Sequence, residues 1–277
     1  MKNIILPIAI LALLFASCNN GNNTKTENEP KSDPSSEQKA LISQIDYTDS
    51  WETQINVTMK YDNQNRLAEL VSTDAEGPTT ISYQDATVAV DMVYFPTKYV
   101  ASDDRIVASV EHNDENIEDY DIVYILKDGK IQESNFSTST GGNTFTYQWE
   151  GGNIKEIHET SDCYGDIFES TTTYTYGTIK NNFSVDLIGM LDDYDFSDPK
   201  VGSLFDGFVS EYLPESKSWE GAVDGWPSTK ITQYEYVVND GLVTEIHVTM
   251  TSSTDYSDQD DGEVETNVLT KTVKIKY

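Results

Sequence analysis

The chain contains few of the residues from which most catalytic and metal sites are built. Among its 277 residues there are two cysteines and three histidines. It also lacks a Gly-x-Ser-x-Gly nucleophile motif, a His-Glu-x-x-His zinc motif, a phosphate-binding loop and a dinucleotide-binding fingerprint. We therefore predict that the protein is not an enzyme and has no catalytic residue, cofactor or bound metal. A hydrolase that uses two carboxylates remains an alternative, because 48 acidic residues leave no particular pair to be selected.

Basic residues are scarce as well. The chain has 18 Lys and Arg residues against 48 Asp and Glu residues, which gives a net charge of −30. Binding to nucleic acid requires clustered Lys and Arg side chains, so nucleic acid is excluded as a partner. The same charge argues against a protein that lies flat on an anionic membrane surface. We interpret the acidity mainly as a device for solubility.

Two weak metal-site patterns are present. His158 and His247 each follow a Glu-Ile pair in two similar segments, which could place both imidazoles on neighbouring strands. Solvated polar residues at strand ends are the simpler interpretation, and metal binding is the alternative. Acidic runs at residues 192–198 and 255–263 offer oxygen ligands of the kind that calcium prefers. Neither run has the Asp-x-Asp-x-Asp-Gly order that surrounds one ion. Polar loops are the simpler interpretation, and calcium binding remains an alternative.

Residues 1–18 have the features of a lipoprotein signal peptide. A positively charged start precedes an apolar run from Ile4 to Phe15, which is short for a membrane span. The run ends in Phe-Ala-Ser-Cys at residues 15–18, which resembles the lipobox of bacterial lipoproteins, with Phe where Leu is usual. The resemblance implies that Cys18 carries the lipid. It further implies a protein anchored in the outer membrane by this lipid alone, on the periplasmic or the cell-surface face.

The segment after the lipobox predicts a tether. Residues 19–42 are mostly Asn, Thr, Glu, Pro, Lys and Ser, which cannot bury enough apolar surface to fold, and a single domain is expected at 43–277. If Cys18 is lipidated, Cys163 has no partner for a disulfide. Acidic residues surround Cys163 and disfavour its thiolate, so we predict that it is not a nucleophile.

The domain shows the pattern of repeated β-hairpins. Residues 59–70, 147–157 and 236–246 each combine a strand that ends near a Tyr, a tight polar turn, and a strand that reads x-Glu-aliphatic. Such repetition predicts an antiparallel meander. The period of two gives most strands one apolar face only. We expect an all-β fold of about a dozen strands, curled into a soluble barrel or half-barrel.

One segment interrupts the hairpins. Residues 179–226 contain an apolar pattern at 185–191 that predicts a short helix, followed by several Gly and Pro residues. We expect this insertion to pack on the sheet and to close the mouth of the barrel. Trp149, Trp219 and Trp226 could supply stacking surfaces for sugars or peptides, although aromatic residues also fill barrel cores.

The lipobox, the tether, the hairpins and residues 179–187, Ile-Lys-Asn-Asn-Phe-Ser-Val-Asp-Leu, together carry a family resemblance. They resemble a family of lipoproteins from gut Bacteroidetes that is classed as a domain of unknown function with a porin-like fold. The resemblance covers residues 43–277. It implies a many-stranded porin-like barrel that is soluble, and it brings no catalytic residues.

These features predict a membrane-anchored lipoprotein that acts as a non-catalytic binding module. The expected ligand is a glycan, a peptide or a lipid. A scaffold or interaction subunit of an outer-membrane complex, with an envelope protein as partner, is the alternative, and a secreted hydrolase is the second. A cavity beneath the 179–226 insertion would favour binding, whereas a filled barrel with an exposed apolar patch would favour the scaffold.

Overall fold

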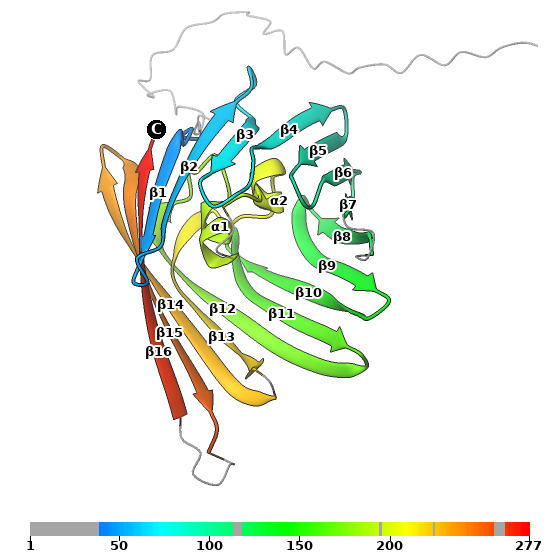
Figure 1. The fold of residues 1–277 in the computed structure, drawn as a ribbon, viewed down its shortest axis with the longest axis vertical. Coiled ribbons are helices and arrows are strands. Elements are labelled where there is room, and N and C mark those ends of the chain that lie inside the picture. The colour runs from blue at the N-terminus through cyan, green and yellow to red at the C-terminus, as the bar shows by residue number, and fades with distance from the viewer. Residues whose placement is uncertain (1–38, 113–117, 194–195, 224, 258–263) are drawn as a thin grey trace, which may run out of the picture. The chain divides into compact units, whose positions relative to one another are not determined.

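The computed structural model describes residues 39–112, 118–193, 196–223, 225–257 and 264–277. In these residues the chain forms a closed barrel of 16 antiparallel strands (Figure 1). Each strand pairs with the next one in the sequence, and β1 closes the barrel against β16. The predicted all-β antiparallel meander is therefore confirmed, as a full barrel rather than a half-barrel.

The strands and two short helices follow one another as a simple series. The strands are β1 (Gln44–Asp49), β2 (Gln54–Tyr61), β3 (Leu67–Ser72), β4 (Thr79–Gln84), β5 (Thr87–Asp91), β6 (Thr97–Ala101), β7 (Arg105–Val110), β8 (Tyr120–Lys127), β9 (Lys130–Thr138), β10 (Gly141–Glu150), β11 (Asn153–Cys163), β12 (Asp166–Lys180), β13 (Tyr212–Val223), β14 (Trp226–Asn239), β15 (Leu242–Asp255) and β16 (Val264–Lys276). The helices are α1 (Leu187–Asp193) and α2 (Lys200–Leu204). The sequence predicted about a dozen strands and missed several of the sixteen, because strands such as β1 and β6 are only 6 and 5 residues long. Runs of that length show little periodicity.

The wall of the barrel is higher on one side than on the other. Strands β1 to β9 contain 5 to 9 residues, whereas β10 to β16 contain 10 to 15. Figure 1 shows the long strands extending well beyond the short ones. The inner surface of the long strands is therefore exposed at this end, which we call the open end.

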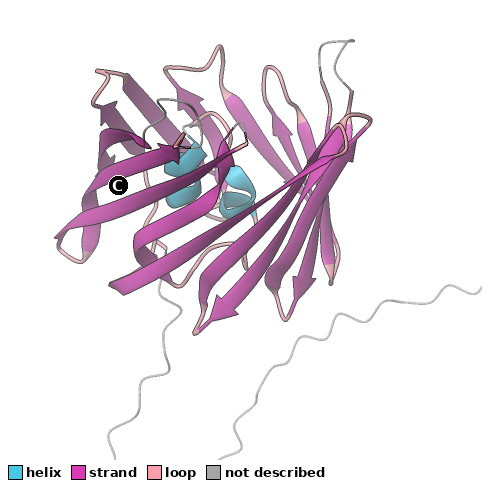
Figure 2. Cartoon of the chain, turned by 90° about the horizontal axis from the view of Figure 1, so that it is seen from below, coloured by secondary structure: helices cyan, strands magenta, loops and turns pink. Residues whose placement is uncertain are grey.

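Both helices lie inside the barrel, where Figure 2 shows them enclosed by the strands. They belong to the connection between β12 and β13, residues 181–211, which we call the plug. The short helix expected near 185–191 is thus present as α1. Leu187, Met190 and Leu191 of α1 are almost fully buried. The ring of Phe196 lies 5.1 Å from that of Tyr47 on the inner face of β1. In the described residues, neither helix has the length or the apolar character to cross a membrane.

The expected insertion 179–226 is longer than the plug. Its last part, Tyr212–Val223, is β13, a regular strand of the wall. This strand was not predicted from the sequence, because it contains Pro214 and Gly221, and both residue types are uncommon in strand interiors. Pro214 lies where the pairing of β12 with β13 changes register.

The domain also begins slightly before residue 43. Most of the expected tether and Cys18 lie in residues 1–38, outside the described part of the chain. Ile42, expected in the tether, is fully buried, and its carbonyl oxygen accepts a hydrogen bond from the hydroxyl of Tyr61 at 2.9 Å. Ala40 forms an isolated bridge with Phe183 at the start of the plug. The aliphatic side chains at 40–42 add apolar surface to the core, so these residues belong to the domain.

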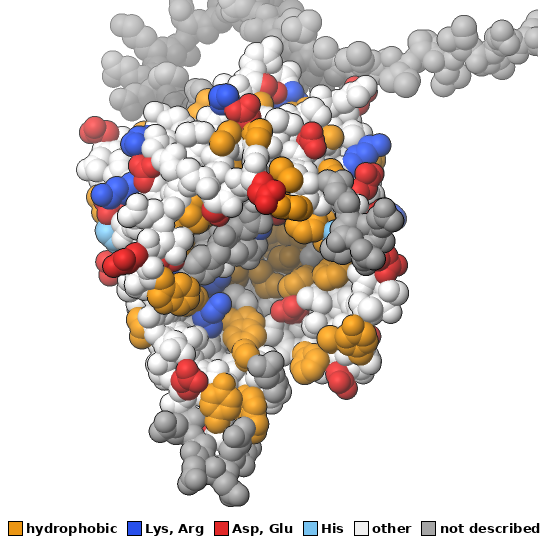
Figure 3. Space-filling view, viewed as in Figure 1, with side chains coloured by type: hydrophobic (Ala, Val, Ile, Leu, Met, Phe, Trp, Pro, Cys, Tyr) orange, Lys and Arg blue, Asp and Glu red, His pale blue; other side chains and the backbone are white. Residues whose placement is uncertain are grey.

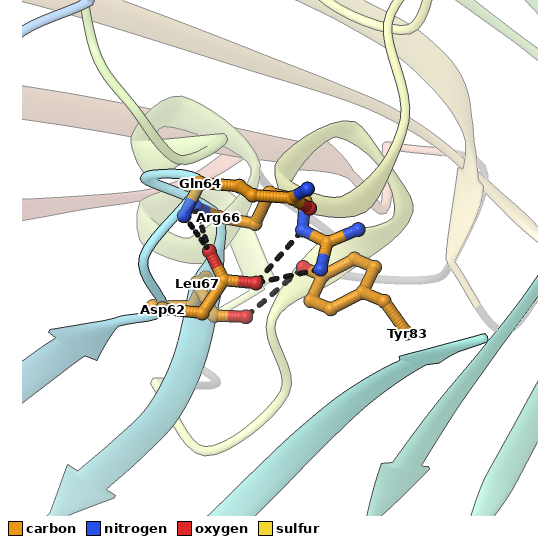
Figure 4. Close-up of polar contacts among 5 residues, drawn as sticks. All are labelled: Asp62, Gln64, Arg66, Leu67 and Tyr83. Carbon is orange, nitrogen blue, oxygen red and sulfur yellow. Dashed lines mark hydrogen bonds and ion pairs between the residues drawn. The ribbon is translucent and has the colours of Figure 1, made fainter. Parts of the chain in front are cut away.

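The turn between β2 and β3 shows how a polar sequence fixes a hairpin (Figure 4). One oxygen of Asp62 accepts hydrogen bonds from the backbone N–H groups of Gln64 and Arg66, at 2.8 and 3.0 Å. The other oxygen accepts from Nε of Arg66 at 2.8 Å. The guanidinium of Arg66 lies 4.1 Å from the centre of the Tyr83 ring on β4. These contacts hold the pKa of Asp62 below its usual value, with the backbone N–H of Arg66 as the largest cause.

Replacing Asp62 with Ala should lower the free energy of unfolding, because the backbone N–H groups of the turn lose their acceptor. Urea denaturation monitored by tryptophan fluorescence measures this difference. Asp103→Ala, which removes an exposed carboxylate from the turn between β6 and β7, is the matched control and should have little effect. Equal stability of the two variants would show that the Asp62 contacts contribute nothing.

Candidate functional site

The interior of the barrel contains two cavities beside the plug. One has a volume of about 440 Å³ and lies against the inner faces of β10 to β13. The other has a volume of about 730 Å³ and lies against β4, β6, β7 and β8 and the loops that precede β4 and β6. Tyr124, Asp186, Gly189 and Val201 contribute to both. The two cavities are therefore adjacent chambers of one lumen, and the plug residues of α1 and α2 lie at their boundary.

Tyrosine is the characteristic residue of this lumen. The lining tyrosines are Tyr94, Tyr99, Tyr120, Tyr124, Tyr147, Tyr174, Tyr176 and Tyr212. Their inward direction follows from the alternation along strands, which places Tyr174 and Tyr176 of β12 on the same face. The rings of this pair are stacked, with centroids 6.2 Å apart. Tyr234 and Tyr236 repeat the arrangement on β14, with centroids 6.4 Å apart.

The tyrosine hydroxyls differ in their hydrogen bonding. Tyr176 donates to the carbonyl oxygen of Ile154 at 2.7 Å, and the hydroxyl of Tyr147 lies 3.2 Å from that of Ser134. Within the part of the chain that the structure describes, the hydroxyls of Tyr99, Tyr124 and Tyr174 form no hydrogen bond. Burial raises the pKa of each of these three groups above its ordinary value, so each stays a neutral donor.

A small polar cluster attaches α1 to the wall. Nζ of Lys217 on β13 lies 2.6 Å from Oδ2 of Asp192, and the Tyr234 hydroxyl donates to Oδ1 at 2.8 Å. Nζ of Lys271 on β16 donates to the carbonyl oxygen of Leu191 at 2.8 Å. Three strands thus hold the carboxyl-terminal end of α1, where cations also interact favourably with the helix dipole.

Lys271 is buried in the lumen, and burial lowers the pKa of its ammonium group to about 8. Among the charged groups around it, Asp192 of α1 and Asp49 of β1 oppose this effect. Lys217 of β13 and Lys230 of β14 reinforce it by like-charge repulsion. This part of the lumen therefore contains several positive charges, although the protein as a whole has a net charge of −30.

Large apolar side chains are exposed at the open end. Trp51 and Tyr164, in the turns after β1 and β11, are 73% and 82% exposed. Tyr94 and Phe95 after β5 are about half exposed. The turns at the other end are polar, as in Asp62–Arg66. In Figure 3 the molecule is hollowed in its middle, with hydrophobic and basic side chains on the wall of the hollow.

The histidine pair predicted from the repeats does not form. His158 lies on β11 and His247 on β15, and three strands separate them in the sheet. The two histidines occupy the same position in two similar hairpins. These hairpins are not neighbours in the sheet, because the plug and β13 lie between them in the sequence. His158 lies 3.3 Å from the Thr171 hydroxyl, and His247 lies 3.3 Å from Glu245.

The remaining predicted residues are dispersed. Cys163 is a free, exposed thiol at the end of β11. The acidic runs at 192–198 and 255–263 each include residues outside the described part. Among the described residues no group of three or more His, Cys, Asp or Glu side chains could hold a metal.

The three tryptophans have different surroundings. Nε1 of Trp149 donates to the carbonyl oxygen of Ile131 at 2.7 Å, and Nζ of Lys130 lies 4.8 Å from the centre of its ring. Trp226 lies 5.6 Å from the Tyr256 ring at the open end. Trp219 faces the lumen from β13.

Sequence reasoning did not identify the lumen tyrosines or the lysine cluster. A signal for the tyrosines was present, since Tyr174 and Tyr176 share one face of a threonine-rich strand. Lys271 gave a signal as well, because it lies on the same face of its strand as Leu269 and Val273. Lys217 gave none, because a lysine between serine residues is normally assigned to the solvent face.

Titration of Lys271 should be visible in the stability of the protein. Its folded pKa of about 8 lies below the ordinary value of 10.5, so between these values the unfolded chain binds more protons and the free energy of unfolding rises with pH. Relative to Lys271→Met, the wild type should gain on the order of 1–2 kcal/mol between about pH 7 and about pH 9.5. Urea titrations at both pH values test this, and the tyrosines titrate equally in both proteins. A difference that does not change with pH would contradict the assignment.

Comparison with known proteins identifies the fold. No protein-family model and no curated protein matches the chain. A crystal structure of a porin-like protein from Bacteroides uniformis ATCC 8492 has a TM-score of 0.53 and 15% identity, and the alignment covers 85% of this chain and 98% of that one. A porin-like protein from Bacteroides vulgatus ATCC 8482 has a TM-score of 0.51 and 14% identity, with 86% and 99% covered. Likeness at such low identity concerns the fold alone, and the barrel therefore has a porin-like fold.

Proposed function

We propose that this protein is a lipid-anchored, non-catalytic binding module whose barrel holds a small organic ligand in the lumen beside the plug. The two adjacent chambers carry this proposal. Their volumes, about 440 and 730 Å³, lie within the range of roughly 300–1,000 Å³ that is usual for small-molecule sites.

The lining of the chambers suits a ligand with both apolar and polar surface. Tyrosine rings offer flat apolar faces, and the hydroxyls of Tyr99, Tyr124 and Tyr174 are donors that no described residue uses. Because these hydroxyls stay neutral, they can bind carbonyl or hydroxyl oxygens over a wide pH range. Glycans, peptides and the head groups of lipids all provide such oxygens.

The carboxylates in the chambers support binding rather than catalysis. Oδ1 of Asp186 accepts from the backbone N–H of Gly189 at 3.0 Å and so caps the first turn of α1. Asp192 is held by Lys217, and Asp198 lies 3.2 Å from Nζ of Lys200. These three carboxylates therefore have structural roles, whereas a general acid or base needs a carboxyl group aimed at the substrate.

The outward face of the wall supports a position outside the hydrocarbon layer. On β12 the outward side chains include Thr173 and Thr175, and on β14 they include Gln233 and Glu235, with single apolar residues such as Ile231 between them. A barrel that spans an outer membrane presents a continuous apolar band instead. The lipid on Cys18 would then be the attachment to the membrane.

A scaffold or interaction subunit is the second candidate. It is favoured by the exposed aromatic side chains at the open end, such as Trp51 and Tyr164. Exposed apolar residues that gather at one end of a molecule are typical of contact surfaces. The lumen chambers do not bear on this role.

The ligand should be visible by native mass spectrometry of residues 39–277 purified from the native host. We expect an additional mass on the wild type, and its loss in Ile157→Trp, because Ile157 lines the 440 Å³ chamber and a larger side chain fills it. Thr173→Trp places the same side chain on the outer face and is the control that should keep the mass. A folded wild-type protein without any bound mass would contradict the proposal.

Lipid anchoring is tested separately. Replacing Cys18 with Ser should move the protein from the membrane fraction to the soluble fraction, because the thioether-linked lipid is then lost. Cys163→Ser is the matched control and should leave the protein in the membrane fraction. If the Cys18 variant still partitions into the membrane fraction, then the barrel or another element provides the attachment.

A further inference from the structure

The inner wall of the long strands carries a second site, beyond the chambers and further from the plug. A cavity of about 350 Å³ lies on β11 to β13, lined by Glu159, Ser161, Phe168, Glu169, Ser170, Trp219, Ala222 and Gly225. The strand register places this cavity next to the 440 Å³ chamber on the same face of the sheet. Thr172 of the chamber pairs with Trp219, and Ser170 lies two residues before Thr172 on the same face. We call the second cavity the Trp219 bay.

The indole of Trp219 reaches over residue 221, where only a glycine leaves room for it. A Cβ atom at Gly221 would lie only 2.6 Å from Cζ2 of Trp219 and 2.9 Å from Cβ of Ser170. The indole therefore occupies the space above the glycine, two residues along the same face of β13. The indole is partly exposed, and the cavity that it lines leaves room for a ligand beside it.

A fixed row of polar groups adjoins the indole. Oε1 of Glu159 accepts from Nδ2 of Asn143 at 2.9 Å, and Oε2 accepts from Oγ of Ser170 at 2.9 Å. Oγ of Ser161 donates to Oδ1 of Asn143, again at 2.9 Å. These four side chains come from three neighbouring strands and face the lumen, because Phe145 of the chamber pairs with Glu159. Each oxygen of the Glu159 carboxylate keeps a further lone pair for a hydroxyl donor.

We propose that the Trp219 bay is a subsite for a neutral pyranose unit of a glycan. The sugar ring stacks on the part of the Trp219 indole that lines the cavity, where its C–H groups meet the negative face of the indole. Its hydroxyls donate to Glu159 and interact with the hydroxyls of Ser161 and Ser170. Carboxylates accept such hydrogen bonds strongly, which compensates for the water that the sugar loses.

The chemistry of the bay distinguishes among the three ligand classes. A lipid chain needs an apolar wall, but the row from Asn143 to Ser170 is polar throughout. An acidic sugar would bring its carboxylate towards Glu159 in a protein of net charge −30. A neutral sugar satisfies both the flat aromatic surface and the acceptors. Because the bay lies beside the 440 Å³ chamber on the same inner face, further sugar units would extend towards Thr172 and the tyrosines. This inference rests on the proposed binding function and specifies its ligand.

Saturation-transfer NMR and calorimetry with defined hexasaccharides test the assignment. The probes are the neutral hexamers of glucose, mannose, xylose and N-acetylglucosamine, together with the anionic hexamer of galacturonic acid. We expect wild-type protein to bind at least one neutral hexamer. Trp219→Ala should weaken that binding roughly tenfold or more, because the stacking surface is removed. Trp219→Phe, which keeps a flat ring, should retain part of the affinity.

Two further variants separate a role in binding from a role in folding. Gly221→Val should weaken binding like Trp219→Ala, since the new side chain displaces the indole while the tryptophan is still present. Trp51→Ala removes an exposed indole from the turn after β1 and should leave binding unchanged. Circular dichroism and urea denaturation establish that each variant is folded before its affinity is compared.

The possible results have distinct meanings. Binding of no neutral hexamer, a preference for the anionic hexamer, or full affinity in Trp219→Ala would each overturn the saccharide subsite. If the mass bound by the native protein is lost in Ile157→Trp but kept in Trp219→Ala, the binding module stands and the subsite fails. If neither variant changes a bound mass, the ligand lies elsewhere and both proposals fail.

Discussion

The width of a sixteen-stranded barrel is the constraint on which the rest of the structure depends. Side chains can fill the interior of a barrel of about eight strands, but not one of about sixteen. The lumen must therefore contain water, a ligand or another part of the chain. In this protein the plug supplies part of the filling, through buried residues such as Leu187, Met190 and Phe196. The chambers and the Trp219 bay are the volume that the plug leaves open.

The plug also explains why charged groups occur inside the barrel. A helix of 7 residues has little stability of its own, so α1 needs partners for its last carbonyl groups. Lys271 supplies one of these, and Lys217 fixes the adjacent Asp192. The lumen is accordingly divided into a polar region that holds the helix and a tyrosine-rich region beside it.

The sequence predicted the local elements better than their arrangement. Alternation along β2 and the turn residues at Gly151-Gly152 and Asp240-Gly241 determine hairpins locally, and these predictions were right. Strand β13 was hidden by Pro214 and Gly221, although Gly221 has its own role beneath Trp219. The candidate site was largely unpredictable, because inward tyrosines and lysines become neighbours only when β8, β10, β12, β13 and β16 curve around one lumen. Which residues share a chamber is a property of barrel closure and not of any single segment.

The bridge between Ala40 and Phe183 has a mechanical consequence. The backbone N–H of Ala40 donates to the carbonyl oxygen of Asn182 at 2.9 Å, and the N–H of Ile42 lies 3.3 Å from Oγ of Ser184. The chain thus enters the domain beside the first residues of the plug, before it reaches β1. Tension applied through the preceding residues would load these two hydrogen bonds first, and would reach α1 before it reached the sheet. The force at which the domain begins to yield would therefore depend on the contacts of a few residues with the plug, and less on the stability of the whole barrel.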